Sequence, residues 1–279
     1  MKLRFAAIAL VLSTPAGAQS ILWGNNAQFG TSAAIESFSK SSGVRTNIFA
    51  GFPGSSINGR GIVVVGNTVY YTVTDDNRIH RMDATTGADM GFITTTQASM
   101  STIAWDGSQF WTSDYSGSNQ AYRIDLSGTT TSTINLANAS GNSDGMEWFN
   151  GKLIANRSDG GSVYDIYDLN GNVLVNAFIN TGEFTTGIAY DGTNFYVSKI
   201  FSNSVGIYSG TTGAFLSDLV FDNTVPPYGQ RLLEDLSVDY EQRIDTATTP
   251  EPATLAMLAP GLLAAFVTAR RRRKSVSLS

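Results

Sequence analysis

The chain repeats itself, and this periodicity limits its fold more than any other feature. Four segments align on one another, and their opening apolar residues, which are 41, 43 and 42 residues apart, are Ile62, Ile103, Met146 and Ile188. Each segment has a short apolar strand, a tight turn, a second strand rich in aromatic or β-branched residues, a polar loop and two further strands. The sequence between residues 19 and 249 shows no helical period. Such units are typical of the four-stranded blades of a β-propeller.

The pieces before and after these four units predict a fifth blade. Residues 21–52 contain three strand-like runs but no opening strand, and residues 235–239 look like an opening strand with nothing after it. Pairing the two ends in one blade would remove sheet edges that otherwise invite aggregation. We therefore expect an all-β propeller of five four-stranded blades over residues 19–240, with adjacent ends and a polar tether over 241–249.

The first 18 residues are typical of a secretory leader. Lys2 and Arg4 precede a short apolar run over 5–12, and residues 16–18 are the small side chains that a signal peptidase requires. The apolar run is too short to cross a bilayer as a mature helix. We expect cleavage after Ala18.

The C-terminus, like the leader, combines an apolar run with basic residues, but there the basic residues follow the run. An uncharged run over 255–269, shorter than the roughly 20 residues of a spanning helix, predicts a short hydrophobic transmembrane helix. A basic cluster follows it, which the positive-inside rule keeps in the cytoplasm, so that residues 19–249 lie outside the inner membrane. The residues that flank the run are Pro250, Glu251 and Pro252 before it, and Arg270, Arg271, Arg272, Arg273 and Lys274 after it.

This order of parts, over residues 250–274, closely resembles the PEP-CTERM sorting signal of Gram-negative-type bacteria. The resemblance implies recognition by an exosortase, a membrane protease-transpeptidase that cleaves near the Pro-Glu-Pro motif. The protein would then pass through the inner membrane only transiently and reach the cell surface or the exopolysaccharide matrix. Residues 275–279 are a short tail after the signal. The alternative is an ordinary single-pass tail anchor. The resemblance concerns transport and leaves the activity of the exported body open.

Composition excludes several functions for that body. Of the 18 basic residues, seven lie in the two ends, which leaves 11 against 22 acidic residues in 19–249. An acidic body repels phosphate backbones, so nucleic acid is a disfavoured partner. The chain contains no cysteine, which excludes disulfides, thiolate zinc sites and thiol redox chemistry. The single histidine, His80, lies in a predicted strand, and we interpret it as a packed strand residue rather than a catalytic base.

The repeat alignment also indicates which side chains surround the mouth of the central channel, where the innermost strands of a propeller begin. The position before the opening of each inner strand is polar or charged in all five blades. The candidate ligand-binding residues are these five and two from a neighbouring loop: Arg60, Ser101, Asp144, Thr186, Glu234, Asp114 and Tyr115. Tyr115 stands out because the other aromatic residues recur in the repeats, which predicts packing between blades.

Carboxylates near the mouth are candidates for a metal site. Hard oxygen ligands suit Ca²⁺, and the expected ligands are Asp144, Glu147, Asp114 and Asp159. The same groups can bind sugar hydroxyls. A third interpretation is that propeller loops are rich in Asp, Asn and Ser because turns require them.

These features support two functional hypotheses. The first is a non-enzymatic surface or matrix protein whose propeller face binds polysaccharide, a metal or another surface protein. The second is a calcium-dependent hydrolase of the lactonase type, with a metal held at the channel mouth. The repeats resemble NHL-like and YVTN-like propellers in general style, and this resemblance implies an architecture without a function.

Overall fold

The computed structural model describes residues 21–27, 35–49, 58–74, 76–222 and 232–243. The chain divides into two units after Arg243. The second unit, residues 244–279, lies outside the described residues, and so do residues 1–18, for which a secretory leader is predicted. The hydrophobic helix and sorting signal predicted for the C-terminus therefore have no counterpart in this description.

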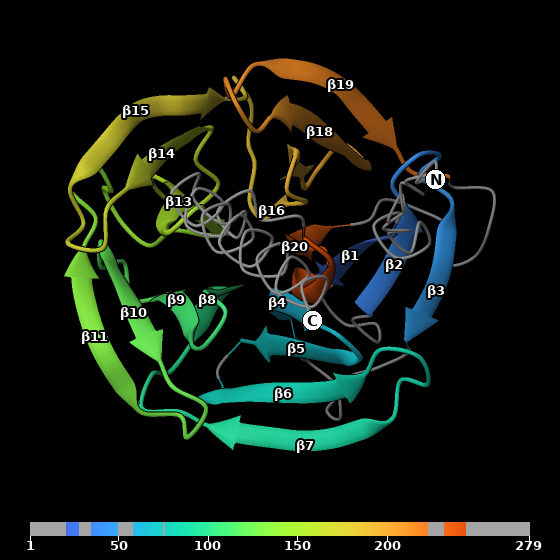
Figure 1. The fold of residues 1–279 in the computed structure, drawn as a ribbon, viewed down its shortest axis with the longest axis horizontal. Helices are drawn as coiled ribbons and strands as arrows, with labels where there is room; N and C mark the ends of the chain where they lie inside the picture. The colour runs from blue at the N-terminus through green and yellow to red at the C-terminus, as the bar shows by residue number, and fades with distance from the viewer. Residues whose placement is uncertain (1–20, 28–34, 50–57, 75, 223–231, 244–279) are drawn as a thin grey trace, which may run out of the picture. The chain divides into compact units, whose positions relative to one another are not determined.

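The described strands form the five-bladed β-propeller that the repeats predict (Figure 1). Each blade is a four-stranded antiparallel sheet, and in four of them the strands follow one another along the chain. From the inner to the outer strand, the first of these blades contains β4 (Gly59–Val65), β5 (Thr68–Val73), β6 (Arg78–Asp83) and β7 (Asp89–Thr94), and the second contains β8 (Met100–Trp105), β9 (Phe110–Asp114), β10 (Gln120–Ile124) and β11 (Thr130–Asn135). The third contains β12 (Met146–Phe149), β13 (Lys152–Asn156), β14 (Val163–Tyr167) and β15 (Val173–Asn180). The fourth contains β16 (Ile188–Tyr190), β17 (Asn194–Lys199), β18 (Ser204–Ser209) and β19 (Phe215–Val220).

The fifth blade joins the two ends of the described chain, as the sequence predicts. Its inner strand is β20 (Leu233–Ser237), which pairs with β1 (Ile21–Asn26) so that Trp23 lies opposite Ser237. Strands β2 (Ile35–Ser39) and β3 (Arg45–Phe49) complete this blade. The last strand of the repeat array thus closes the ring from the inside.

The turns form where the sequence places residues that tolerate a left-handed backbone. In the first hairpin of the β12 blade, Asn150 and Gly151 have φ values of 50° and 78°. These values suit the type I′ turns that join twisted strands. The aspartates before the last hairpins, such as Asp168, accept backbone N–H bonds within their own turns, from Asn170 and Asn172 at 2.9 Å. They act as turn formers, as expected.

Recurring aromatic residues pack between blades, which also agrees with the sequence analysis. Phe149 of the β12 blade meets Tyr190 of the β16 blade edge-on, with ring centroids 4.9 Å apart. Phe195 lies 5.0 Å from the same Phe149 ring. Such arrangements add to the apolar burial that holds neighbouring sheets together.

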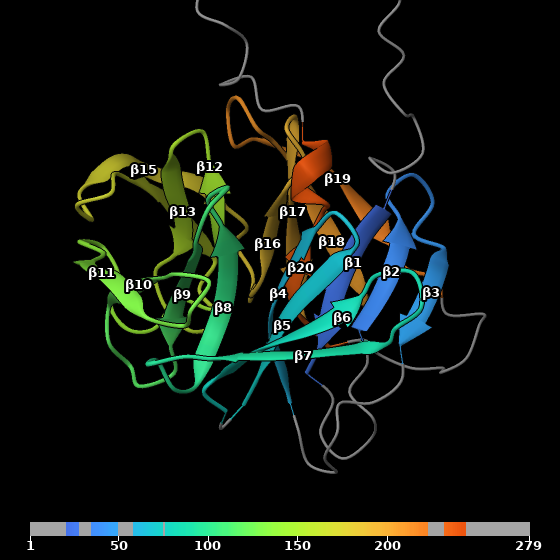
Figure 2. The same cartoon turned by 60° about the horizontal axis from the view of Figure 1, so that its bottom comes forward.

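All five inner strands begin at one end of the ring, here called the mouth, and end at the other, here called the far end. In Figure 2 the inner strand β8 points toward the far end, where the short 3₁₀ helix η2 (Tyr240–Gln242) lies. Residues 241–243 were expected in the polar tether. The structure differs here, because Arg243 packs against Glu147 and Tyr240. No helix among the described residues has the length and apolar character to cross a membrane.

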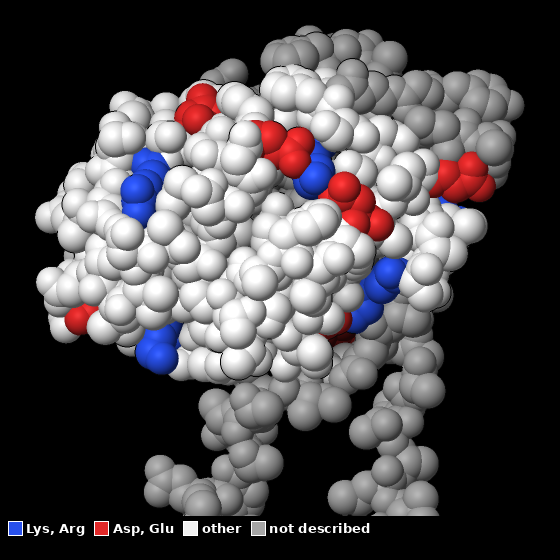
Figure 3. Space-filling view, turned by 90° about the horizontal axis from the view of Figure 1, so that it is seen from above, with Lys and Arg blue, Asp and Glu red and all other residues white. Residues whose placement is uncertain are grey.

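The outer strands expose apolar side chains. Figure 3 views the ring from the side on which β15 and β19 lie, and charged side chains are sparse on that face. The exposed large apolar residues of these two strands are Leu174, Val175, Phe215, Leu216 and Val220.

Candidate functional site

The five residues predicted to ring the mouth do lie at the start of the inner strands, but all five are buried. Two of them are occupied by contacts between blades. The Ser101 hydroxyl donates to the carbonyl of Ser143 at 2.6 Å, and the Thr186 hydroxyl donates to the carbonyl of Leu233 at 3.2 Å. Ser101 and Thr186 therefore join neighbouring inner strands instead of presenting hydroxyl groups to a ligand.

Arg60 and Glu234 form an ion pair across the mouth, between β4 and β20. Burial raises the pKa of Glu234, and the charge of Arg60 opposes that shift. The Arg60 guanidinium also lies over the ring of Tyr115, 4.3 Å from its centroid, which is a cation–π geometry. Its Nε atom is buried and donates no hydrogen bond within the described structure.

Asp144 and Asp159 form a hydrogen-bonded pair of carboxyl groups beside this ion pair. Burial raises the pKa of Asp144 to about 9, and the hydrogen bond with Asp159 adds to the shift. The same hydrogen bond lowers the pKa of Asp159. Asp144 therefore holds a proton at neutral pH and Asp159 is ionised, which is how two close carboxyl groups avoid mutual repulsion.

Other donors fix this pair in place. Asn142 Nδ2 and the backbone N–H of Gly160 each donate to Asp144 at 3.1 Å. The Tyr115 hydroxyl donates to Asp159 at 3.0 Å. Burial raises the pKa of Tyr115 to about 12, so this hydroxyl stays protonated and remains a donor.

Asp114 is surrounded by donors from its own loop, from the connection between β7 and β8, and from β10. Its Oδ1 atom accepts from the backbone and hydroxyl of Ser116 and from Ser118, and its Oδ2 accepts from Gln97 at 3.0 Å and Tyr122 at 2.8 Å. Burial alone would raise the pKa of Asp114, but these hydrogen bonds outweigh it and lower the pKa. With five donors around it, the carboxylate organises the loop.

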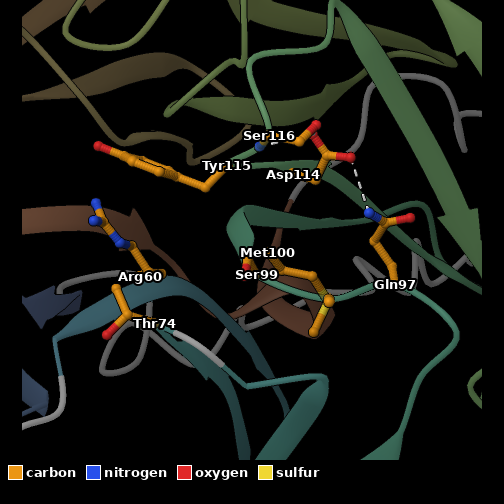
Figure 4. A pocket seen from close by; sticks show the side chains of 9 residues that line it. Arg60, Thr74, Gln97, Ser99, Met100, Asp114, Tyr115 and Ser116 are labelled. Atoms are coloured by element: carbon orange, nitrogen blue, oxygen red, sulfur yellow. Dashed lines mark hydrogen bonds between the residues drawn. The ribbon is translucent and has the colours of Figure 1, made fainter.

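A cavity of about 330 Å³ opens at the mouth between β4, β8 and the loop after β9. Figure 4 shows Arg60 and Tyr115 on one side of it and Gln97 bonded to Asp114 on the other. Its volume is at the lower end of the roughly 300–1,000 Å³ of small-molecule sites. The lining residues are Arg60, Thr74, Gln97, Ala98, Ser99, Met100, Asp114, Tyr115 and Ser116.

Asp235 fills the axis of the ring between the inner strands. Its Oδ2 accepts from the backbone N–H of Ile62 at 3.1 Å and from the Thr102 hydroxyl at 3.0 Å, while its Oδ1 accepts from the N–H of Leu236. A Cβ atom on Gly187 would lie only 2.2 Å from the Asp235 Cα, so the inner strands are in close contact. Asp235 occupies the alignment position held by Gly61, Thr102, Gly145 and Gly187 in the other blades. An aspartate where the other blades have glycine or threonine is the sequence signal that could have identified Asp235 as a special residue.

Glu147 lies away from the mouth and contacts the C-terminal segment. Its carboxylate accepts from the Tyr240 hydroxyl and forms an ion pair with Arg243, at 2.7 Å from Nη2. The Arg243 guanidinium in turn lies 3.5 Å from the centroid of the Tyr240 ring. Sequence reasoning missed this cluster, which secures residues 240–243 to the far end of the ring.

The four predicted metal ligands do not converge on one point. Glu147 is bound by the C-terminal segment, Asp114 by its own loop, and Asp144 and Asp159 by each other. Among the described residues, no group of three or more His, Asp or Glu side chains is arranged to hold a metal ion. His80 lies in β6, bonds Asp76 through Nε2 at 2.9 Å and stacks on Tyr71.

Comparisons with known proteins identify the fold but no family. No protein-family model matches the chain, and no curated protein matches it. Among solved structures, the chain is similar to one in a nidogen/laminin complex, with 15% identity, a TM-score of 0.52, and coverage of 78% of this chain and 97% of that one. It also matches the glutaminyl cyclase of Myxococcus xanthus, with 12% identity, a TM-score of 0.47, and coverage of 65% and 70%. At 15% identity the likeness to the first of these structures is one of fold, and it agrees with a β-propeller.

Proposed function

We propose that this chain is an exported surface or matrix protein whose propeller binds a neutral saccharide at the mouth, without catalysing a reaction. The cavity between Arg60 and Tyr115 is the observation that carries the proposal. It combines an aromatic ring, hydroxyl and amide groups, and a guanidinium whose Nε donates no hydrogen bond in the described structure. Sugars present hydroxyl groups and apolar C–H faces, and a cavity with a few polar groups beside an aromatic ring suits both.

The charge around the cavity favours a neutral ligand over an anionic one. The Arg60 charge is balanced by Glu234. Asp114 and Asp159 both have lowered pKa values and remain ionised at neutral pH. The mouth is therefore negative overall, which repels phosphates and uronates.

Saccharide binding is tested with a glycan array probed by the full chain. We expect binding to neutral saccharides that is lost in Tyr115→Ala and reduced in Tyr115→Phe, which keeps the ring but cannot donate to Asp159. The matched control is Phe92→Ala, because Phe92 is 47% exposed on the outer strand β7 and Tyr115 is 42% exposed. Absence of binding, or equal binding by Tyr115→Ala, would refute the proposal.

We further propose that the chain is exported through its leader and processed at its C-terminal signal by an exosortase. The order of residues 250–274 supports this, and so does the position of Arg243, which ends the first unit seven residues before Pro250. Cleavage near Pro250 would leave the closing strand β20 in the propeller. Mass spectrometry of the surface-released protein should find neither residues 1–18 nor the basic cluster. Recovery of an intact Arg270–Lys274 segment would overturn the sorting proposal.

A further inference from the structure

Two exposed aromatic rings lie at the mouth in blades other than that of Tyr115. Phe184, in the connection between β15 and β16, is 47% exposed, and Phe201, after β17, is 61% exposed. Their ring centroids are 5.1 Å apart. They form an apolar surface beside the cavity.

A continuous series of contacts links this pair of rings to the cavity. The Tyr115 hydroxyl bonds Asp159, and the next residue, Gly160, lies against the ring of Phe184. A Cβ atom on Gly160 would be 1.9 Å from the Phe184 Cζ, so glycine is required for this approach. The residues from Tyr115 through Asp159 and Gly160 to Phe184 and Phe201, here called the aromatic track, thus place aromatic rings on both sides of one carboxylate.

We propose that the aromatic track binds a linear, neutral saccharide chain several sugar units long, with one end of it in the cavity. This inference rests on the proposed function and extends its ligand from one sugar to a polymer. Rings on both sides of a carboxylate match the chemistry of such a chain, since its C–H faces pack on the rings while a hydroxyl bonds Asp159. A charged polysaccharide fits less well because Asp159 is ionised beside the track.

The test measures affinity for neutral, linear oligosaccharides of increasing length by the full chain, using the array members that bind. We expect affinity to rise with length. In Phe201→Ala that rise should shrink by roughly two- to twelvefold, the usual contribution of one aromatic contact. Binding of the shortest saccharide should stay unchanged. Phe184→Leu, which keeps apolar volume against Gly160 but removes the ring, should act in the same direction, whereas Phe92→Ala should have no effect.

The outcomes separate this inference from the function on which it rests. If short saccharides bind through Tyr115 but length and the Phe201 substitution have no effect, the track is refuted and the cavity proposal stands. If uronate chains bind more tightly than neutral ones, the charge argument for a neutral chain is refuted. If no saccharide binds, both proposals fail together. Unchanged thermal unfolding of Phe201→Ala, expected for so exposed a side chain, ensures that a loss of binding reports the contact.

Discussion

Replacing Asp144 with Asn should change how the stability of the propeller depends on pH. Burial raises the pKa of Asp144 from its ordinary value of 3.8 to about 9. Between these two values the folded protein holds a proton that the unfolded chain releases. The contribution of Asp144 to stability is therefore complete below pH 3.8 and decreases as the pH rises toward 9. Asn carries no such proton, so the variant lacks this decrease.

The expected size of this pH dependence follows from a difference of one bound proton between the folded and the unfolded protein. A difference of one bound proton changes the free energy of unfolding by about 1.4 kcal/mol per pH unit, or about 2.7 kcal/mol between pH 6 and 8. Asp159 adds no slope in this range because its pKa is lowered in the folded protein. Burial also raises the pKa values of Glu147, Glu234 and Asp235. These residues are present in both proteins, so their contribution cancels in the difference.

The amide of Asn can donate to Asp159 but accepts through one oxygen, so one of the donors Asn142 and Gly160 loses its acceptor. This costs about 1 kcal/mol at every pH and shifts the curve without changing its slope. The assay is urea denaturation of the full chain at several pH values from 6 to 8. Asp168→Asn serves as a control, because Asp168 is an exposed turn residue with a lowered pKa and is ionised throughout this range. Equal slopes for Asp144→Asn and the unaltered protein would refute the assignment of the proton.

Three substitutions and two truncations test the closure of the ring. Asp235→Ala removes the acceptor on the axis and should lower the free energy of unfolding in urea by at least about 3 kcal/mol, whereas Asp235→Asn, which retains an oxygen, should lose less. Tyr240→Phe removes the hydroxyl that donates to Glu147, and chemical denaturation should show a loss of about 1–3 kcal/mol. A chain ending at Arg243 should keep its melting temperature, whereas one ending at Leu232 lacks β20 and should fail to give a cooperative thermal transition.

The fold was predictable from the sequence because repeated segments show both the strand pattern of one blade and how successive blades follow one another. The spacing of Ile62, Ile103, Met146 and Ile188 defined four blades. The unmatched strand around residues 235–239 could pair only with the unmatched strands near the N-terminus. Turn residues such as Asn150 and Gly151 agree with this arrangement because their backbone conformation is local. Each of these signals depends only on the order and spacing of residues along the chain.

The site was less predictable because its chemistry depends on partners far apart in the chain. The alignment correctly placed Arg60, Ser101 and Asp144 at the start of inner strands. It could not show that the carbonyl of Ser143 accepts a hydrogen bond from the Ser101 hydroxyl, or that Asp144 retains a proton. Glu147 is the clearest example, since its partner Arg243 is almost a hundred residues away and belongs to a segment expected to be a tether. Position along a strand predicts which end of a propeller a residue occupies, but not which group neutralises it.

The buried carboxyl groups of the ring are stabilised in different ways, and three of them show the range. Asp144 near the mouth keeps a proton, Asp235 on the axis accepts several hydrogen bonds, and Glu147 toward the far end pairs with Arg243. An uncompensated buried charge costs several kcal/mol, so these arrangements are the means by which the ring tolerates acids inside it. Only Asp235 lies on the axis between the inner strands, and the recess beside Tyr115 is the place where a ligand entering at the mouth meets polar groups. This interior agrees with the binding at the mouth that we propose.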